Sequence, residues 1–161
     1  MSPHRVPDPP ELDVTEWIGQ PSPLSSLKGR VVLVETFQML CPGCVTRGLP
    51  QTQRVQRAFP ELAVVGLHTV FEHHHAMTPD ALRVFLSEFR ITFPVGIDRH
   101  ADGDPIPVTM RAYGLQGTPS TLLFDRSGAL RLSTFGAVDD LALGAELGRL
   151  LAEPEPPATS G

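Results

Sequence analysis

Residues 35–44 read ETFQMLCPGC and contain both cysteines of the chain, Cys41 and Cys44. A β-branched, apolar run at residues 31–37 leads into this stretch, and a segment compatible with a helix follows it. Two thiols separated by two residues can cycle between a dithiol and a disulfide without a metal or an organic cofactor. The placement of this pair between a strand and a helix is the most informative feature of the sequence.

The bulk composition indicates one globular domain. The chain has 161 residues, of which 41% are hydrophobic, enough for a sizeable core. Its formal net charge is -5. This charge argues against nucleic acid and anionic membrane surfaces as partners, because both favour a basic face.

The N-terminal residues 1–10 contain neither the apolar stretch nor the small-residue cleavage site of a signal peptide. No apolar run approaches the roughly 18 residues of a membrane-spanning helix. We therefore expect a cytoplasmic protein. In a reducing cytosol a CxxC pair is more often catalytic, redox-sensing or metal-binding than structural.

The two ends of the chain are rich in proline and polar residues, so we expect disordered tails at 1–12 and 152–161 around one domain at 13–151. Within the domain, strands and helices alternate. Thr78 followed by Pro79 is typical of a helix start, whereas Gly48 and Pro50 should bend or break the helix that contains them. We expect strands at 31–37, 62–70, 93–97, 120–125 and 129–135, and helices at 44–59, 79–89, 107–113 and 139–151.

This order predicts an α/β fold with a mixed sheet. Helices between the early strands imply parallel pairing. The turn at 126–128 (RSG) joins the last two strands as an antiparallel hairpin. Helices should cover both faces of the sheet.

The thiol chemistry depends on what favours a thiolate. Cys41 should lie at the start of the helix after strand 31–37, where free N–H groups and the helix dipole stabilise an anion. Pro42 suits a first helical turn, and Gly43 leaves the sulfurs uncrowded. Cys44 then lies one turn below Cys41. We assign Cys41 as the attacking nucleophile and Cys44 as the buried resolving thiol.

Glu35 lies six residues before Cys41, inside an otherwise apolar strand. A buried carboxylate there should have a raised pKa and could accept the proton of Cys44, directly or through water. The alternative is a solvated Glu35 at the edge of the sheet.

Three features together resemble the thioredoxin superfamily, and most of all the thioredoxin-like redoxin branch that includes TlpA-type proteins. They are the CPGC motif with an acid six residues upstream, the segment GTPSTLLFD at 117–125, and the order of the elements through the closing hairpin. The resemblance covers residues 24–151. It implies a thioredoxin fold, a three-layer sandwich, and a thiol–disulfide oxidoreductase.

The resemblance also implies roles for individual residues. Cys41 and Cys44 match the redox pair, and Glu35 matches the buried acid. Pro119 matches a cis-proline that faces the disulfide, and Thr118 before it would offer backbone groups to an extended substrate. An ordinary trans proline at the start of an edge strand is the alternative for Pro119.

The chain departs from the family pattern at three places. Leu40 replaces the usual tryptophan before the first cysteine, and with Pro42 it should line the substrate contact. Pro50 lies one residue later than the usual helix proline, and the only tryptophan, Trp17, lies far upstream, at a core or edge position.

The expected partners are protein or small-molecule disulfides and thiols, with an unidentified reductant or oxidant and no cofactor. The Pro42–Gly43 dipeptide fixes no direction of electron flow, so reductase and oxidase or isomerase activity both stay open.

A thiol peroxidase is a competing interpretation, because peroxiredoxins share this fold. They need a Thr or Ser three residues before the reactive cysteine and a proline upstream, and here Gln38 and Val34 occupy these positions. Peroxide consumption by the purified protein would support this alternative.

A zinc site or a non-catalytic interaction module are further alternatives. Zinc would need His68 or residues 73–75 (HHH) beside the single dithiol. A dithiol inert to alkylation would instead favour the interaction module. The acidic residues Asp98, Asp102 and Asp104 lack EF-hand spacing, and we expect them in a solvated loop.

Overall fold

The structure is a computed structural model and describes residues 5–157. Six strands form one sheet with the spatial order β1-β4-β3-β2-β5-β6. The three neighbours β2, β3 and β4 run parallel, and β1, β5 and β6 are antiparallel to their partners. The bounds are β1 Val14–Ile18, β2 Val32–Phe37, β3 Ala63–His68, β4 Val95–Asp98, β5 Ser120–Phe124 and β6 Leu130–Phe135.

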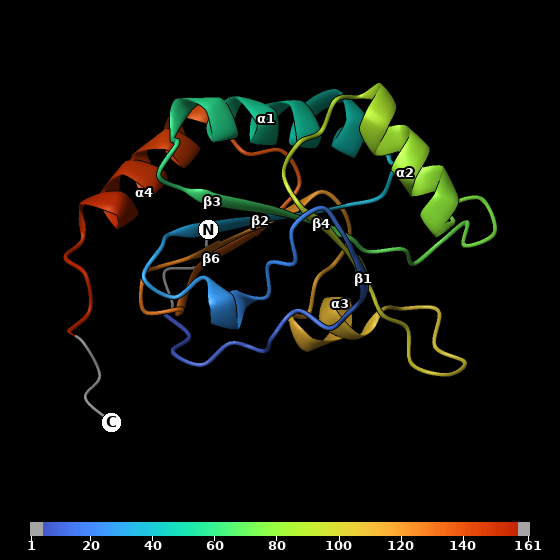
Figure 1. The fold of residues 1–161 in the computed structure, drawn as a ribbon, viewed down its shortest axis with the longest axis horizontal. Helices are drawn as coiled ribbons and strands as arrows, with labels where there is room; N and C mark the ends of the chain where they lie inside the picture. Colours follow the sequence, from blue (N-terminus) through green and yellow to red (C-terminus); the bar gives the residue numbers. More distant parts are fainter. Residues whose placement is uncertain (1–4, 158–161) are drawn as a thin grey trace.

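Helices cover both faces of this sheet, as the sequence predicts (Figure 1). One face carries α1 (Leu49–Ala58), α2 (Pro79–Glu88) and α4 (Asp140–Ala152). The other carries the short α3 (Val108–Ala112) and a 3₁₀ turn at Leu24–Ser26. The result is a three-layer α/β architecture.

The alternation of side chains along the strands divides the core into two clusters. Leu33 and Val64 face α1, α2 and α4. Their neighbours Val32 and Val65 face the α3 side. Because both faces of β2 and β3 are covered, all their residues are buried, including the polar Glu35 and Thr36 of β2 and His68 of β3.

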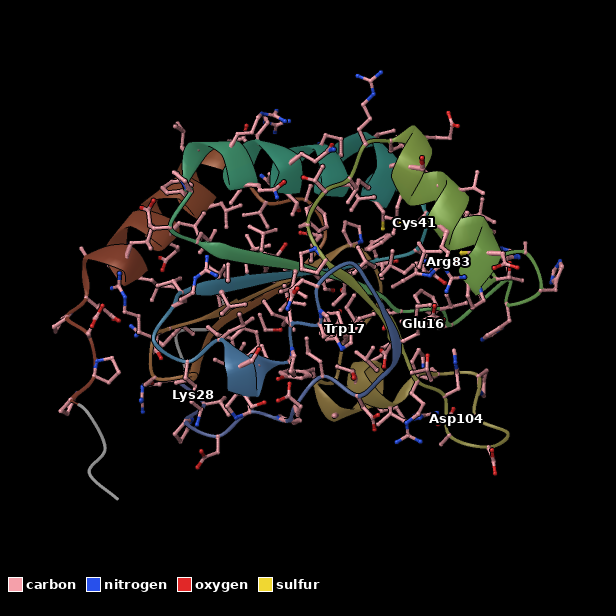
Figure 2. All side chains as sticks on the ribbon, in the orientation of Figure 1. Glu16, Trp17, Lys28, Cys41, Arg83 and Asp104 are labelled. Atoms are coloured by element: carbon pink, nitrogen blue, oxygen red, sulfur yellow. The ribbon has the colours of Figure 1, made fainter. Side chains whose placement is uncertain are left out.

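The structure adds one strand that the sequence analysis did not predict. Strand β1 pairs antiparallel with β4 at the edge of the sheet, and Trp17 lies on it, partly buried against the core. The expected core or edge position of Trp17 is therefore confirmed. Glu16 on the same strand forms an ion pair with Arg83 of α2, which ties this edge to the helix layer (Figure 2).

The expected N-terminal tail is ordered over the part that the structure describes. Val6 forms a two-way backbone bridge with Leu130 of β6, and Leu12 is buried. The hydroxyl of Tyr113 donates to the carbonyl of Pro10. Residues 6–12 thus pack on the domain, whereas residues 1–4 of the predicted tail lie outside the described part of the chain.

The C-terminal tail, expected from residue 152, begins where α4 ends at Ala152. Glu153, the next residue, accepts hydrogen bonds from Arg131, so the first part of this segment also contacts the domain. Residues 158–161 lie outside the described range.

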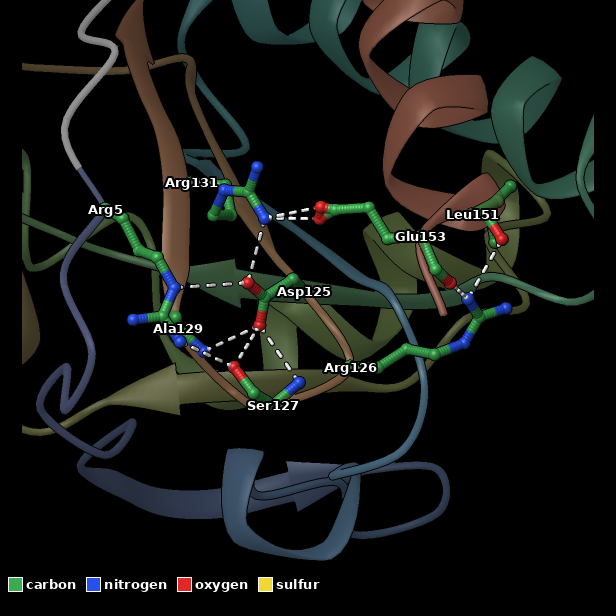
Figure 3. Close-up of polar contacts among 8 residues, drawn as sticks. All are labelled: Arg5, Asp125, Arg126, Ser127, Ala129, Arg131, Leu151 and Glu153. Atoms are coloured by element: carbon green, nitrogen blue, oxygen red, sulfur yellow. Dashed lines mark hydrogen bonds and ion pairs between the residues drawn. The ribbon is translucent and has the colours of Figure 1, made fainter. Parts of the chain in front are cut away.

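Asp125 is the centre of a polar network at the β5–β6 hairpin (Figure 3). Its carboxylate accepts hydrogen bonds from the backbone N–H groups of Ser127 and Ala129 and pairs with Arg131 at 3.0 Å. Arg131 also binds Glu153, after α4, and Arg5 approaches Asp125 from the N-terminal segment. The network therefore joins the hairpin to both ends of the described chain.

The expectation for Asp98 is wrong. Asp98 is the last residue of β4 and is only 1% exposed, rather than part of a solvated loop. Its carboxylate accepts hydrogen bonds from the hydroxyl of Thr69 and from the backbone N–H groups of Thr109 and Met110 at the start of α3. Burial raises the pKa of Asp98. The loop beyond it does hold the exposed Asp102.

Candidate active site

The two cysteines lie beyond the carboxyl end of the central strand β2. A turn closed by a hydrogen bond from the Cys41 N–H to the Gln38 carbonyl (3.0 Å) places Cys41 at the edge of the parallel strands. Cys41 is partly exposed, whereas Cys44 is completely buried. The order of exposure matches the assignment of Cys41 as the attacking and Cys44 as the resolving thiol.

The surroundings of the two sulfurs differ accordingly. The Cys41 Sγ accepts a hydrogen bond from the Cys44 N–H at 3.3 Å and lies 3.5 Å from the carbonyl oxygen of Thr118. Burial raises the pKa of the Cys44 thiol well above its usual value. A proton acceptor is thus needed before Cys44 can act as a nucleophile.

The helix after the cysteines begins with a π-helical turn, Cys44–Gly48, and continues as α1. The N–H of Leu49 bonds to the Cys44 carbonyl, five residues back, and Pro50 has no N–H to donate. A π turn contains one residue more than an α turn, which explains why Pro50 lies one residue later than the usual helix proline. The sequence predicts that Gly48 and Pro50 bend or break the helix here, and the structure has a π turn at this place.

Pro119 lies directly before β5 and close to this turn, and the Thr118–Pro119 peptide bond is cis. A Cβ atom at Gly48 would come within 3.0 Å of the Pro119 ring, so the glycine permits the close approach of the helix to the proline. The carbonyl of Pro119 accepts a hydrogen bond from Gly136. Pro119 therefore contacts both the turn after the cysteines and the loop after β6.

Two large apolar side chains are exposed around this arrangement. Leu40, which the sequence places at the substrate contact, is 53% exposed. Phe135, at the end of β6, is also 53% exposed, and its ring lies against Gly117. Phe135 was not predicted, because its position beside residues 117–119 depends on the pairing of β5 with β6.

Glu35 is buried in β2, with 2% of its surface exposed. Burial raises the pKa of its carboxyl to about 8, although the hydroxyls of Thr52 and Thr121, each 3.1 Å from Oε2, oppose this shift. The solvated alternative for Glu35 is therefore wrong.

The Thr52 hydroxyl has two acceptors within reach. Its Oγ1 lies 2.8 Å from the Gly48 carbonyl and 3.1 Å from Glu35 Oε2, yet a hydroxyl carries one proton. Thr52 therefore donates to only one of these oxygens at a time. Burial remains the larger influence on the pKa of Glu35.

His68 has a different place from the one that a zinc site would require. It is buried at the end of β3, and its Nε2 accepts a hydrogen bond from the N–H of Met39 at 3.1 Å. Burial lowers the pKa of His68 to about 4, so the ring is neutral near pH 7. His68 thus supports the turn that carries Cys41.

The other candidate zinc ligands lie in the loop after β3. Nε2 of His74 lies 2.9 Å from the carbonyl of Pro105, and its ring packs edge-on against that of His100. His73 and His75 are exposed. Within residues 5–157 no group of three or more His, Cys, Asp or Glu side chains is arranged to hold a metal ion.

Gln38, at the position that a peroxiredoxin would fill with Thr or Ser, is also buried. Its Oε1 accepts a hydrogen bond from the N–H of Phe71 at 3.1 Å. This contact joins the turn before Cys41 to the loop after β3. Gln38 and His68 are support residues that the sequence analysis did not identify, since both act through backbone groups distant in the chain.

Comparison with known proteins gives two close structural relatives. The crystal structure of the thioredoxin-like superfamily protein SPOA0173 is 52% identical, with a TM-score of 0.88, covering 91% of this chain and 97% of that one. A thiol-disulfide isomerase from Corynebacterium glutamicum is 51% identical with the same TM-score and the same coverage.

A curated relative is more distant. Protein DipZ of Mycobacterium tuberculosis is 27% identical over 132 residues, which are 78% of this chain but only 18% of that protein. No family model matches the chain. Among the described residues, no helix is long and apolar enough to cross a membrane.

Proposed function

The chain belongs to the thioredoxin-like superfamily, and from this premise we propose that it is a thiol–disulfide oxidoreductase whose redox centre is the Cys41–Cys44 pair. The observation that carries the proposal is the partly exposed Cys41, whose sulfur lies 3.5 Å from the Thr118 carbonyl and 3.3 Å from the backbone nitrogen of the buried Cys44. The isomerase activity named for the relative from C. glutamicum is of the same chemical class.

The reaction proceeds in two exchange steps. The thiolate of Cys41 attacks one sulfur of a substrate disulfide, which forms a mixed disulfide and releases the first substrate thiolate. Cys44, as a thiolate, then attacks the Cys41 sulfur, forms the Cys41–Cys44 disulfide and releases the second substrate thiolate. Two electrons pass from the enzyme dithiol to the substrate, and the reverse sequence oxidises a substrate dithiol.

Glu35 serves the second step. Cys44 must lose its proton in a buried site, where a charged sulfur is costly. The Glu35 carboxyl reaches the helix after Cys44, with Oε2 3.1 Å from the Thr52 hydroxyl, and its pKa of about 8 suits it to accept that proton at neutral to weakly alkaline pH. The proton passes to Glu35 directly or through one water.

Substrate binds at the surface around Cys41. Leu40 and Pro42 are exposed beside the sulfur, and the backbone of Thr118 borders it from the other side. An extended peptide that pairs with the Thr118 backbone would bring its disulfide to Cys41. Substrates of this kind are protein or small-molecule disulfides and thiols.

Reduction of a disulfide substrate by the two single-cysteine variants tests the mechanism. With dithiothreitol-reduced protein and a fluorescent disulfide peptide, Cys41→Ser should abolish reduction. Cys44→Ser should accumulate a stable mixed disulfide on Cys41, visible by mass spectrometry. Full activity of Cys41→Ser would show that the proposed nucleophile is wrong.

The reduction potential of the pair gives the direction of electron flow. Equilibration with a glutathione redox series and quantification of the Cys41–Cys44 disulfide measures it. A value near or below the cytosolic poise assigns a reductase, and a much higher value assigns an oxidase or isomerase.

A further inference from the structure

One oxygen of the buried acid lacks a partner. Of the buried side-chain oxygens and nitrogens in the described residues, only Glu35 Oε1 has no hydrogen bond. A Cβ atom at Gly48 would lie 3.2 Å from Oε1, so the absence of a side chain there keeps space open beside it. A buried polar atom without a partner is costly, and in proteins such atoms are usually bonded to water.

Glu35 lies in the lining of a cavity of about 260 Å³. Thr46, Gly48 and Gln51 line one side, and residues 136–140 line the other. Its volume exceeds the roughly 30 Å³ that one water occupies in the liquid, so several waters fit. Gln51 fixes the two sides to each other, because its Nε2 donates to the Val138 carbonyl and to Asp140 at 2.8 Å each.

The cavity opens to solvent away from the substrate surface. Its lining includes the exposed residues Arg47, Ala137 and Asp139. It does not include residues 40–42 or 118–119, which border the Cys41 sulfur. A substrate that contacts only residues 40–42 and 118–119 leaves this opening free.

An opening to solvent that is separate from the substrate surface would let Glu35 release its proton in each turnover. Glu35 can accept the Cys44 proton only when it is ionised, and with a pKa of about 8 only about a tenth of it is ionised at pH 7. Each turnover must return the carboxyl to its ionised form. A protein substrate bound through Cys41 would cover the surface formed by residues 40–42 and 118–119, so a route to solvent elsewhere is useful at this stage.

We propose that the cavity between α1 and residues 136–140 is the proton exit of the enzyme, through which water carries the Cys44 proton from Glu35 to solvent while substrate occupies the other side. This inference rests on the proposed function. The Cys44 thiol gives its proton to the Glu35 carboxylate and becomes the attacking thiolate. The carboxylic acid then gives the proton through Oε1 to cavity water, which passes it to solvent or buffer.

Closing the opening tests the proposal. Ala137→Trp adds a large side chain at an exposed lining position, and Leu141→Trp adds the same group at a position that is 84% exposed and outside the lining. A mixed disulfide with a folded protein substrate is formed on Cys41, and its resolution by Cys44 is followed by stopped flow between pH 6 and 9. Attack by Cys41 is measured separately in the Cys44→Ser background.

Ala137→Trp should slow resolution at least about five-fold below pH 8, which is less than the roughly 10²–10⁴-fold that general base catalysis contributes, and should leave attack unchanged. Leu141→Trp should change neither step. Equal resolution rates in Ala137→Trp and wild type would overturn the proton exit but not the proposed function. Absence of a mixed disulfide in Cys44→Ser would instead contradict the proposed function itself.

Chemical rescue supplies a second readout of the same resolution step. In Glu35→Ala, formate should enter the cavity, replace the missing carboxylate and restore resolution. The added Ala137→Trp change should abolish this rescue, and the added Leu141→Trp change should retain it. Rescue that persists in Glu35→Ala/Ala137→Trp would show that formate enters by another route, and this result would overturn the proposal.

Discussion

At the scale of the residue, Glu35 combines a structural cost with a chemical use. Its carboxyl is buried in a strand whose other residues are almost all apolar, and two hydroxyls compensate only one of its oxygens. In the unfolded chain the same group is solvated and titrates near 4.5. This difference in pKa makes the free energy of unfolding depend on pH.

The pKa of Glu35 predicts how stability varies with pH. Because the folded pKa of about 8 exceeds the unfolded value, the folded state binds more protons between pH 4.5 and 8, and the free energy of unfolding should fall as pH rises through this window. Glu35→Gln removes the titration, so it should gain stability relative to wild type as pH rises, by an amount on the order of a few kcal/mol. Urea unfolding of the reduced proteins at pH 5.0, 7.0 and 8.5 measures this difference.

Glu61→Gln is the matched control, since Glu61 is exposed. Its offset from wild type should stay constant over the same pH range. A Glu35→Gln offset that is equally constant would mean that the Glu35 carboxyl is not buried as described.

At the scale of the element, the ends of helices are specified by few residues. The hydroxyl of Thr78 accepts a hydrogen bond from the N–H of Ala81, and Pro79 occupies the first position of α2, as the sequence predicts. The beginning of α2 is therefore readable from two adjacent residues.

Removing this cap should cost about 1 kcal/mol of unfolding free energy in Thr78→Ala, because the Ala81 N–H loses its acceptor. Thr78→Ser keeps a hydroxyl and should retain most of the stability. Chemical denaturation of the three proteins at pH 7 compares them. A loss in Thr78→Ser as large as in Thr78→Ala would attribute the effect to the lost methyl group instead of the cap.

Some of these elements could be predicted from the sequence, and others could not. The apolar runs of β2 and β3, the hairpin and the spacing of Glu35, Cys41 and Cys44 are local patterns, and they were predicted. Strand β1 was not predicted, because it becomes a strand only by pairing with β4, some eighty residues away. The burial of Asp98 likewise requires α3 to fold over its carboxylate.

At the scale of the whole molecule, the redox site and the Asp125 network use opposite ends of β5. Pro119, before the start of β5, faces the cysteines, and Asp125, just after its end, joins the hairpin to both termini of the described chain. Stability and reactivity should therefore be separable.

Asp125→Ala should lower the free energy of unfolding by roughly 1–3 kcal/mol, because the buried N–H of Ala129 loses its acceptor and Arg131 loses one of two carboxylate partners. Burial raises the pKa of Asp125, but hydrogen bonds from Ser127, Arg131 and Ala129 together outweigh it and hold the pKa below the ordinary value. The contribution of Asp125 to stability is therefore present above pH 3.8 and is lost as pH falls further. Thermal unfolding at pH 7 and pH 3 checks both statements.

Asp102→Ala, at an exposed acid, is the control and should leave stability unchanged. The alkylation rate of Cys41 should be the same in both variants and wild type. A slower Cys41 in Asp125→Ala would mean that the two ends of β5 are coupled.

The central claim is that the two thiols are asymmetric, with Cys41 as the nucleophile and Cys44 buried beneath it. Alkylation of the reduced protein by limiting iodoacetamide at pH 7, with peptide mapping by mass spectrometry, measures this asymmetry directly. The account predicts that Cys41 is alkylated at least about ten times faster than Cys44, since burial raises the pKa of the Cys44 thiol. Equal rates, or a faster Cys44, would contradict it.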